Sequence, residues 1–293
     1  DEIKTLREQR REREKKLIEQ GKDVPFPSYE AYAAEENEDE PFLLFLIRDA
    51  DGNLIRQLKT KPSKGVNRIV WDGRYPSKQP VSLQPRPENI FGNPDQGILA
   101  MPGEYSVSLM QSVNGELTEL VPERTFRLQS LGGITLPARD RAELLEFQRQ
   151  AAELQRSFSG ASRLFSDVEN RLKHIRQALL AAEEPLPELY GELRRLEQEL
   201  KDMRKKIWGD PVAQRLDQPT PYAPADRLGW LGFEMWNSTS TPTHTYRETL
   251  RIVEKEFRPQ YERLKEIVET DLRQLEEKLE AAGAPYTPGR LRH

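Results

Sequence analysis

Apolar residues between Arg139 and Ala182 recur at alternating steps of three and four positions, and no polar residue interrupts the series. This spacing lasts for about five heptads and predicts one long amphipathic helix of a coiled coil or helical bundle. At about 1.5 Å per residue the helix would be about 65 Å long, so partner helices must lie beside it. The series consists of Leu144, Phe147, Ala151, Leu154, Phe158, Ala161, Phe165, Val168, Leu172, Ile175 and Leu179.

Two later segments carry a similar pattern and are the expected partner helices. Leu186 to Ile207 again alternates steps of three and four, and the tight reversal at 183–187 favours an antiparallel hairpin with the long helix. The last segment follows an eleven-residue repeat, which predicts a straight or slightly right-handed helix. Its apolar positions are Leu250, Val253, Phe257, Tyr261, Leu264, Val268, Leu272, Leu275 and Leu279.

Capping and helix-breaking residues mark the limits of the last helix. Thr241 is the expected N-cap, Pro242 suits the first helical position, and Pro259 should kink the helix modestly. The preceding residues 210–240 are expected to be irregular apart from one short helix over 226–236. Three tryptophans in or beside this region are expected to cover the exposed half of the long helix: Trp208, Trp230 and Trp236.

Residues 42–128 carry the signals of short strands joined by turns. Asp-Gly and Asn-Gly pairs separate apolar runs, which predicts β-hairpins, and residues 102–109 alternate with the period of a half-buried strand. Several such strands predict a small antiparallel sandwich, and the stretch 75–101 is expected to be one long loop. The predicted strands are Phe42–Ile47, Leu54–Leu58, Val66–Trp71, Pro102–Leu109, Leu117–Leu120 and Thr125–Leu128.

These patterns predict an α+β chain with three parts. Residues 1–40 form a charged helical segment, ending at Gly21, and an irregular linker over 24–40; residues 41–130 form the sandwich with its Pro-rich loop at 79–97; residues 134–293 form a long antiparallel helical bundle. The loop is long enough to suggest contact with a protein partner. Residues 1–20 hold too little apolar surface to be stable alone, so they are expected to pack on a neighbour or to be solvated.

Composition narrows the classes of function. The 293 residues are 36% hydrophobic and 32% charged, with a net charge of −4, and acidic and basic residues are intermixed. This balance argues against a nucleic-acid surface. The absence of cysteine excludes thiolate catalysis and cysteine–zinc sites, and no apolar run is long enough to span a membrane.

No set of residues predicts a catalytic, cofactor or metal site. The three histidines, His174, His244 and His293, lack metal-ligand spacing. The acid pairs Asp49/Asp51, Glu183/Glu184 and Glu276/Glu277 lie in a turn or on helix surfaces, whereas a glycosidase needs two carboxylates held across a cleft.

Other polar or aromatic motifs have structural interpretations. Residues 49–53 faintly resemble a calcium loop but lack its bidentate glutamate, so a hairpin turn is the better interpretation. Gly132-Gly133 is expected to be a hinge, residues 238–241 a helix cap, and Trp71 a buried core residue. The aromatic stripe Trp230, Phe233 and Trp236 either fills a gap in the core or binds a ligand.

Two groups of residues resemble a known family. The strand segment is similar to the Ig-like module of the flagellar-hook capping protein and of many bacterial surface proteins, and residues 241–289 resemble the end of large bacterial sortilin-like proteins. The family's usual Asp-Pro-Arg between the two parts is replaced here by Leu131-Gly132-Gly133. The matching residues are Ile47-Arg48-Asp49, Gly52-Asn53, Gly65 to Asp72, Pro102-Gly103-Glu104-Tyr105, Thr241-Pro242-Thr243 and Ala282 to Gly289.

The resemblance implies a function as part of a larger protein. In that family a BNR-repeat β-propeller precedes an Ig-like module and a helical tail, so this chain would follow a strand of its own sandwich within a longer, extracytoplasmic polypeptide. Its expected role is non-catalytic: it would brace the upstream propeller and present a protein-binding surface on the helices and the 79–97 loop. Two alternatives stay open, namely the accessory end of a glycoside hydrolase with its active site upstream, and a self-associating coiled coil.

Overall fold

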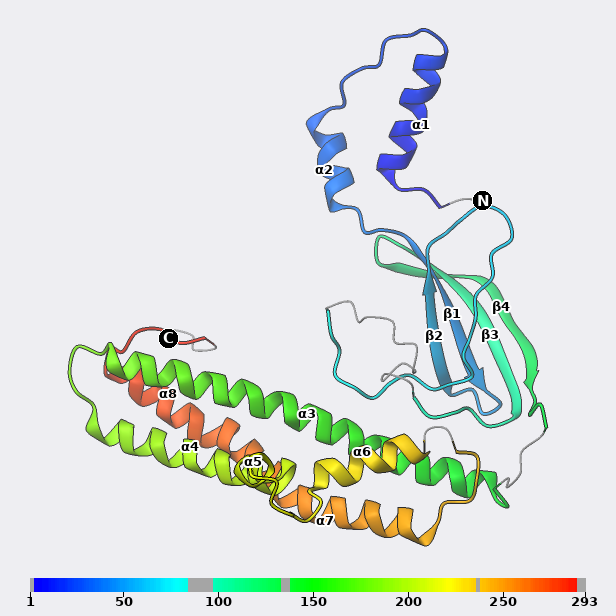
Figure 1. The fold of residues 1–293 in the computed structure, drawn as a ribbon. Coiled ribbons are helices and arrows are strands. Elements are labelled where there is room, and N and C mark those ends of the chain that lie inside the picture. The colour runs from blue at the N-terminus through cyan, green and yellow to red at the C-terminus, as the bar shows by residue number, and fades with distance from the viewer. Residues whose placement is uncertain (1–2, 84–96, 133–137, 236–237, 289–293) are drawn as a thin grey trace. The chain divides into compact units, whose positions relative to one another are not determined.

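The computed structural model describes residues 3–83, 97–132, 138–235 and 238–288. They belong to two compact units (Figure 1). The sheet unit comprises residues 1–76 and 99–133, and the helical unit comprises residues 77–98 and 134–293. The protein is therefore of mixed α and β structure, with one antiparallel sheet and a larger number of residues in helices.

The sheet unit contains a four-stranded antiparallel sheet with the order β2-β1-β3-β4. Its strands are β1 (Phe42–Asp49), β2 (Leu54–Thr60), β3 (Gly103–Val113) and β4 (Glu116–Leu128). Both predicted hairpins are present, and the β3–β4 turn places Asn114 at φ 50° and Gly115 at φ 79°. These left-handed values suit a tight hairpin turn, which explains why Asn-Gly stands there.

The two-layer sandwich is not confirmed, because the described strands form a single sheet. The predicted strand at Val66–Trp71 is wrong: these residues are irregular, and Val66 and Val70 are exposed. Local turn chemistry replaces the strand there, since the Asn67 side chain amide donates to the carbonyl oxygens of Ser63 and Gly65. The two strands predicted at 117–120 and 125–128 are one continuous strand, β4, with register shifts opposite residues 107–110.

The core of the sheet unit lies on one face of the sheet. Ile47, Ile55 and Tyr105 are buried there. Trp71 is half-buried, and its ring packs edge-on against Tyr105 with the ring centroids 5.5 Å apart. Its indole Nε1 donates to the carbonyl of Arg74 at 3.0 Å. Trp71 therefore packs against the core as expected, but it is half-buried and not buried, and it lies on an irregular segment.

Residues 1–40 contain two helices rather than one helix and an irregular linker. Helix α1 (Leu6–Glu19) has the predicted charged character and no buried residue, whereas α2 (Tyr29–Asn37) replaces part of the linker expected at 24–40. The Ser28 side chain accepts from the amide of Ala31 and so caps α2. Such a cap stabilises a short helix that lacks apolar spacing.

The helical unit is built on α3 (Arg141–Leu180), whose predicted seam is confirmed by burial along its length. Helix α4 (Pro187–Trp208) runs antiparallel to it (Figure 1). The direction follows from pairs that link the late part of one helix to the early part of the other. Arg176 pairs with Glu197, and Arg204 pairs with Glu169 at 2.6 Å.

The last long helical segment runs parallel to α3. It consists of α7 (His244–Glu266), a π-helical turn η1 (Ile267–Asp271) and α8 (Leu272–Ala281). Early residues pair with early residues and late with late, as in the Arg247–Glu143 ion pair at 2.8 Å and the Arg171–Glu276 ion pair at 2.7 Å. Since α4 is antiparallel to both, it pairs with each of them along a common core.

Helix α4 is too short to cover the first part of α3, and α6 (Pro224–Met235) covers it instead, after the short α5 (Pro211–Arg215). Leu231 and Met235 of α6 pack with Phe147 and Ala151 in a second cluster. The tryptophans do not fill this place. Trp208 lies further along α3 against Phe158 and Phe165, Trp230 contacts Tyr246 near the surface, and Trp236 lies outside the described residues.

Three details of the last helical segment differ from the prediction. Its N-cap is Thr243, whose hydroxyl accepts from the amide of Tyr246, so the helix begins after Pro242. The segment continues through Pro259 as α-helix. The irregularity lies at η1, where the Leu272 amide donates to the Ile267 carbonyl five residues earlier. With this extra residue Ile267 is fully buried in the core, and the predicted Val268 is partly buried against it.

Candidate functional site

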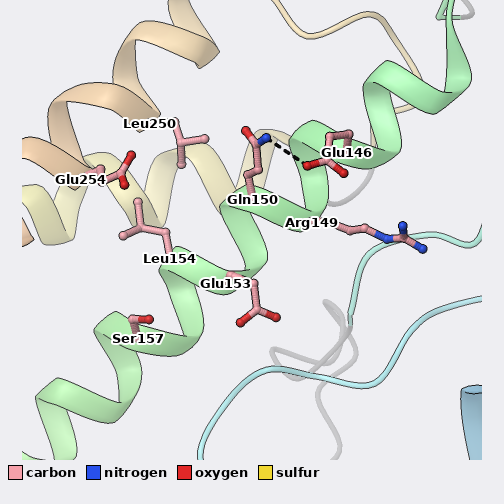
Figure 2. A pocket seen from close by; sticks show the side chains of 8 residues that line it. All are labelled: Glu146, Arg149, Gln150, Glu153, Leu154, Ser157, Leu250 and Glu254. Carbon is pink, nitrogen blue, oxygen red and sulfur yellow. Dashed lines mark hydrogen bonds between the residues drawn. The ribbon is translucent and has the colours of Figure 1, made fainter.

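A groove opens on the surface of the helical unit between α3 and α7 (Figure 2). Its floor is apolar, and its rim carries carboxylates, an arginine, an amide and a hydroxyl. The α3 residues lie on one face because they are spaced three and four apart, and α7 contributes two residues at the opposite wall. The groove is lined by Glu146, Arg149, Gln150, Glu153, Leu154, Ser157, Leu250 and Glu254.

Two of the carboxylates that line the groove, those of Glu146 and Glu153, are held by hydrogen bonds or ion pairs. Gln150 donates its amide to Glu146 at 3.0 Å. Lys78 donates a hydrogen bond to one carboxylate oxygen of Glu153 at 2.7 Å, and Arg156 donates to the other oxygen at 3.1 Å. The Lys78 hydrogen bond, and more weakly Arg156, lower the pKa of Glu153 below its ordinary value.

The lowered pKa of Glu153 limits the chemistry that this carboxyl can perform. A general acid of a glycosidase needs a raised pKa, so that it carries a proton at neutral pH. Glu153 has the opposite shift and is ionised and paired. The groove is therefore suited to hold polar or cationic groups such as the Lys78 ammonium, and the lowered pKa of Glu153 does not suit this carboxyl to act as a general acid.

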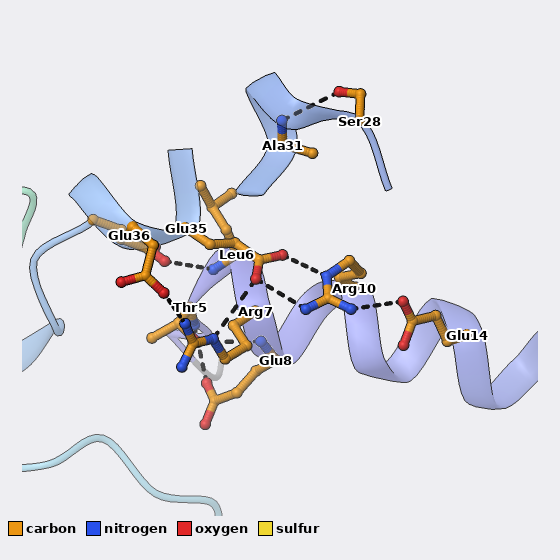
Figure 3. A network of polar contacts seen from close by, with 11 residues as sticks. Thr5, Leu6, Arg7, Glu8, Arg10, Glu14, Ser28, Ala31, Glu35 and Glu36 are labelled. Atoms are coloured by element: carbon orange, nitrogen blue, oxygen red, sulfur yellow. Dashed lines mark hydrogen bonds and ion pairs between the residues drawn. The ribbon is translucent and has the colours of Figure 1, made fainter. Parts of the chain in front are cut away.

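A second polar cluster joins α1 to α2 (Figure 3). Arg10 donates to both carboxylate oxygens of Glu35, at 2.6 and 3.0 Å, and Arg7 pairs with Glu36 at 2.7 Å. Arg10 also donates to Glu14 and lies 5.1 Å from the ring centroid of Tyr32. Because α1 buries no side chain, these charged contacts supply the specific link between the two helices.

The link depends on ionised Glu35. The hydrogen bond from Arg10 lowers the pKa of Glu35 below its ordinary value, and the charge of Arg7 acts in the same direction. Thr5 caps the start of α1 with two reciprocal hydrogen bonds. The Thr5 hydroxyl accepts from the Glu8 backbone amide, and the Glu8 carboxylate accepts from the Thr5 backbone amide. The sequence places basic residues at 7 and 10 and acidic residues at 35 and 36. These residues can be matched as ion pairs only once α2 is known to be a helix.

The histidines do not come together in a site. His174 is exposed on the flank of α3, with its Nδ1 2.8 Å from the Asn170 carbonyl oxygen, and His244 is the exposed first residue of α7. His293 lies outside the described residues. In the part of the chain that the structure describes, no group of three or more histidine or acidic side chains could hold a metal ion.

The acid pairs and loop motifs have local partners. Asp49 Oδ1 accepts from the amides of Asp51 and Asn53, at 3.1 and 2.8 Å, so its carboxylate closes the hairpin turn. Glu276 is buried against Arg171, and Glu183 and Glu184 are exposed at the α3–α4 turn. Gly132 adopts φ 84°, a value that suits glycine in a bend, while Gly133 falls outside the described residues.

The remaining motifs also have structural positions. Ser238 accepts from the Ser240 amide, and Thr241 accepts from the Arg139 amide at the start of the long helix. Of the aromatic stripe, Trp230 and Phe233 point outward from α6, and Trp236 is not described. Neither residue fills the core, so the ligand interpretation of the stripe stays a prediction. Most of the 79–97 loop also lies outside the described residues.

Strand β4 offers the most extended accessible surface of the sheet unit. It is an edge strand of 13 residues, exposed along its whole length except near its end. Leu117, Leu120 and Val121 are apolar and exposed on it. Sequence reasoning missed this feature because it expected a second sheet to cover the strands.

Comparisons with known proteins found no match: no family model, no curated protein and no solved structure matches the chain. Among the residues that the structure describes, no helix combines the length and apolar character needed to cross a bilayer.

Proposed function

We propose that this chain is a non-catalytic structural and interaction module that binds a protein partner along the open edge of its sheet. The observation that carries the proposal is β4, a 13-residue edge strand with exposed apolar side chains. An edge strand presents unpaired backbone donors and acceptors to an incoming strand. Exposed apolar residues such as Leu117 and Leu120 add the surface that such a partner would bury.

The proposed partner is an upstream β-propeller of the same polypeptide, as the resemblance to sortilin-like proteins implies. In this arrangement the partner strand extends the sheet of the Ig-like module, and the coiled-coil-like helical bundle braces the propeller in an extracytoplasmic protein. The pairing of Glu153 with Lys78, which lowers the pKa of the Glu153 carboxyl, supports a non-catalytic role. If the parent is a glycoside hydrolase, its catalytic carboxylates lie in the propeller.

Self-association through the long helix is the less favoured alternative. The seam that would join two copies is occupied within one chain, since Phe165, Leu172 and Ile175 are fully buried against other helices. A coiled coil between chains would need this seam to be open. The observation favours a monomer whose binding surface lies elsewhere.

The test is the stoichiometry of the chain mixed with the propeller polypeptide, measured by light scattering on a size-exclusion column. We expect a monomer alone and a 1:1 complex in the mixture. The double variant Leu117→Lys, Leu120→Lys should weaken the complex by at least about tenfold, because lysine on an edge opposes strand pairing. Leu54→Lys, on the opposite edge strand β2, is the matched control and should leave the complex intact. A stable dimer indifferent to the propeller would refute the proposal.

A further inference from the structure

The turn between α1 and α2 presents apolar side chains to solvent at the end of the hairpin away from β1. Phe26 is 89% exposed, Tyr29 82% and Ile18 65%. Phe26 stands between Pro25 and Pro27, whose fixed backbone angles limit the freedom of the turn. A large aromatic side chain held almost entirely in water indicates a surface that contacts something apolar.

The same end of the hairpin carries cations that have no partner. Among the described residues, five exposed basic side chains make no ion pair or hydrogen bond: Arg11, Arg13, Lys15, Lys16 and Lys22. The basic residues nearer the start of α1 are different, since Lys4, Arg7 and Arg10 are each paired with a glutamate.

The unpaired charges leave a positive surplus within residues 11–29, which we call the basic tip. Glu12 is paired with Lys4, and Glu14 is paired with Arg10, which also pairs with Glu35. Glu19, Asp23 and Glu30 are the nearby carboxylates without an ion pair, of which the first two fall inside the tip. Residues 11–29 hold five cations and four carboxylates, those of Glu12, Glu14, Glu19 and Asp23, so the basic tip has a net charge of +1, although the whole chain carries −4.

Cations and apolar groups share one side of α1. Arg11, Lys15 and Ile18 follow steps of four and three, so they lie on the same helical face, next to the turn that carries Phe26. Basic residues together with exposed aromatic and aliphatic side chains are the combination by which peripheral proteins bind anionic bilayers.

We propose that the basic tip binds the surface of an anionic lipid bilayer. Phe26 and Ile18 enter the headgroup region, and Arg11 and Lys15, which share the helical face of Ile18, lie over the lipid phosphates and carboxylates. A bilayer accepts a projecting turn without a matching concave surface, which a folded protein partner would have to provide. This contact is separate from β4, so a membrane surface and the proposed protein partner can engage the chain at the same time.

The test is vesicle flotation of the full chain with two lipid compositions. Phosphatidylcholine vesicles serve as the neutral surface, and vesicles with about 30 mol% phosphatidylserine serve as the anionic one. We expect at least about tenfold tighter binding to the anionic vesicles at about 0.1 M salt, and most of it lost at about 0.5 M salt, because screening weakens surface charge interactions.

Two variants separate the contributions of charge and apolar insertion. Arg11→Gln with Lys15→Gln, and separately Phe26→Ser, should each weaken anionic-vesicle binding by about fivefold or more. The matched controls, Lys255→Gln with Arg258→Gln on α7 and Phe233→Ser on α6, alter exposed residues of the same kinds in the helical unit and should change nothing. Circular dichroism checks that all variants keep their helices.

Three outcomes would overturn the proposal: no binding to anionic vesicles, equal loss in the control variants, or tighter binding to polyglutamate or to an oligonucleotide than to the vesicles. The last result would assign the tip to an acidic macromolecule in place of a bilayer. Failure here leaves the β4 experiment unaffected, since the Leu117→Lys, Leu120→Lys variant keeps the tip intact.

Discussion

The π-helical turn η1 leads to a sharp prediction about deletions. The buried positions on either side of it are Leu264, Ile267 and Leu272, so one step in the series is five residues long. Removing one residue from this turn reduces the step to four and restores an ordinary helical series. We therefore expect that deletion of the exposed Glu269 keeps α7 and α8 in register with α3 and α4. The ion pair of Arg263 with Asp271 also survives, because partners eight residues apart become seven apart, still on one face.

Deletions of Glu269 and of Glu256 are expected to change the free energy of unfolding by different amounts. Deleting Glu269 exchanges a π turn for an α turn and should change the free energy of unfolding by about 1 kcal/mol or less, the scale of one backbone hydrogen bond. Deleting Glu256, also exposed but in regular helix, rotates the flanking segments by about 100° relative to each other. Even if only the shorter segment leaves the core, Leu250 and Val253 lose their burial. That loss costs about 3–6 kcal/mol.

The assay is urea unfolding of the two deletion variants, followed by far-ultraviolet circular dichroism. The slope of the transition shows whether each variant still unfolds as the wild type does. We expect the Glu269 deletion to unfold near the wild-type midpoint and the Glu256 deletion to unfold far below it. If both deletions destabilise the protein equally, η1 is required for packing and the interpretation of it as a single inserted residue is wrong.

Three further predictions concern the helical unit. Leu193→Ala removes a fully buried side chain of α4 and should lower the free energy of unfolding by about 2–5 kcal/mol in urea titration, whereas the exposed Leu180→Ala should change it by less than about 0.5 kcal/mol. Glu276→Ala leaves its α3 arginine partner without a counter-charge in a half-buried site and should cost about 1–3 kcal/mol, and Glu277→Ala, which removes an exposed pair, should be nearly neutral in the same titration. Glu199 has a lowered pKa, chiefly through its hydrogen bond from an α7 arginine, so it stabilises the fold above its unfolded pKa of about 4.3 and loses that effect as pH falls further. Urea midpoints measured from pH 6 down to about pH 3 should therefore fall less steeply for Glu199→Gln than for the wild type; equal slopes would contradict this assignment.

The long helices were predictable because their apolar periodicity is unbroken over many turns. Leu144 to Leu179 and Leu189 to Ile207 face the core as the spacing required. The η1 turn was not predictable in the same way, because both Ile267 and Val268 are apolar and either can continue a series of threes and fours. Only packing against the neighbouring helices selects Ile267.

The sheet and the polar clusters were less accessible to sequence reasoning. The segment 66–71 has strand composition, yet the Asn67 side chain folds it locally through hydrogen bonds to Ser63 and Gly65. Helix α2 lacks apolar spacing, so its cap at Ser28 was the only local signal. The groove near Glu153 depends on the pairing of α3 with α7 and on Lys78, which are distant in sequence.

The parallel course of α3 and α7–α8 has a mechanical consequence. The start of α3 and the end of α8 lie at opposite ends of the helical unit, separated by about 60 Å for a helix of 40 residues. Tension applied between these two points slides the helices along each other, so that many side-chain contacts, including the Arg171–Glu276 pair, must break together. An antiparallel pair pulled from adjacent ends would instead open one contact at a time. The helical unit should therefore resist stretching along its axis.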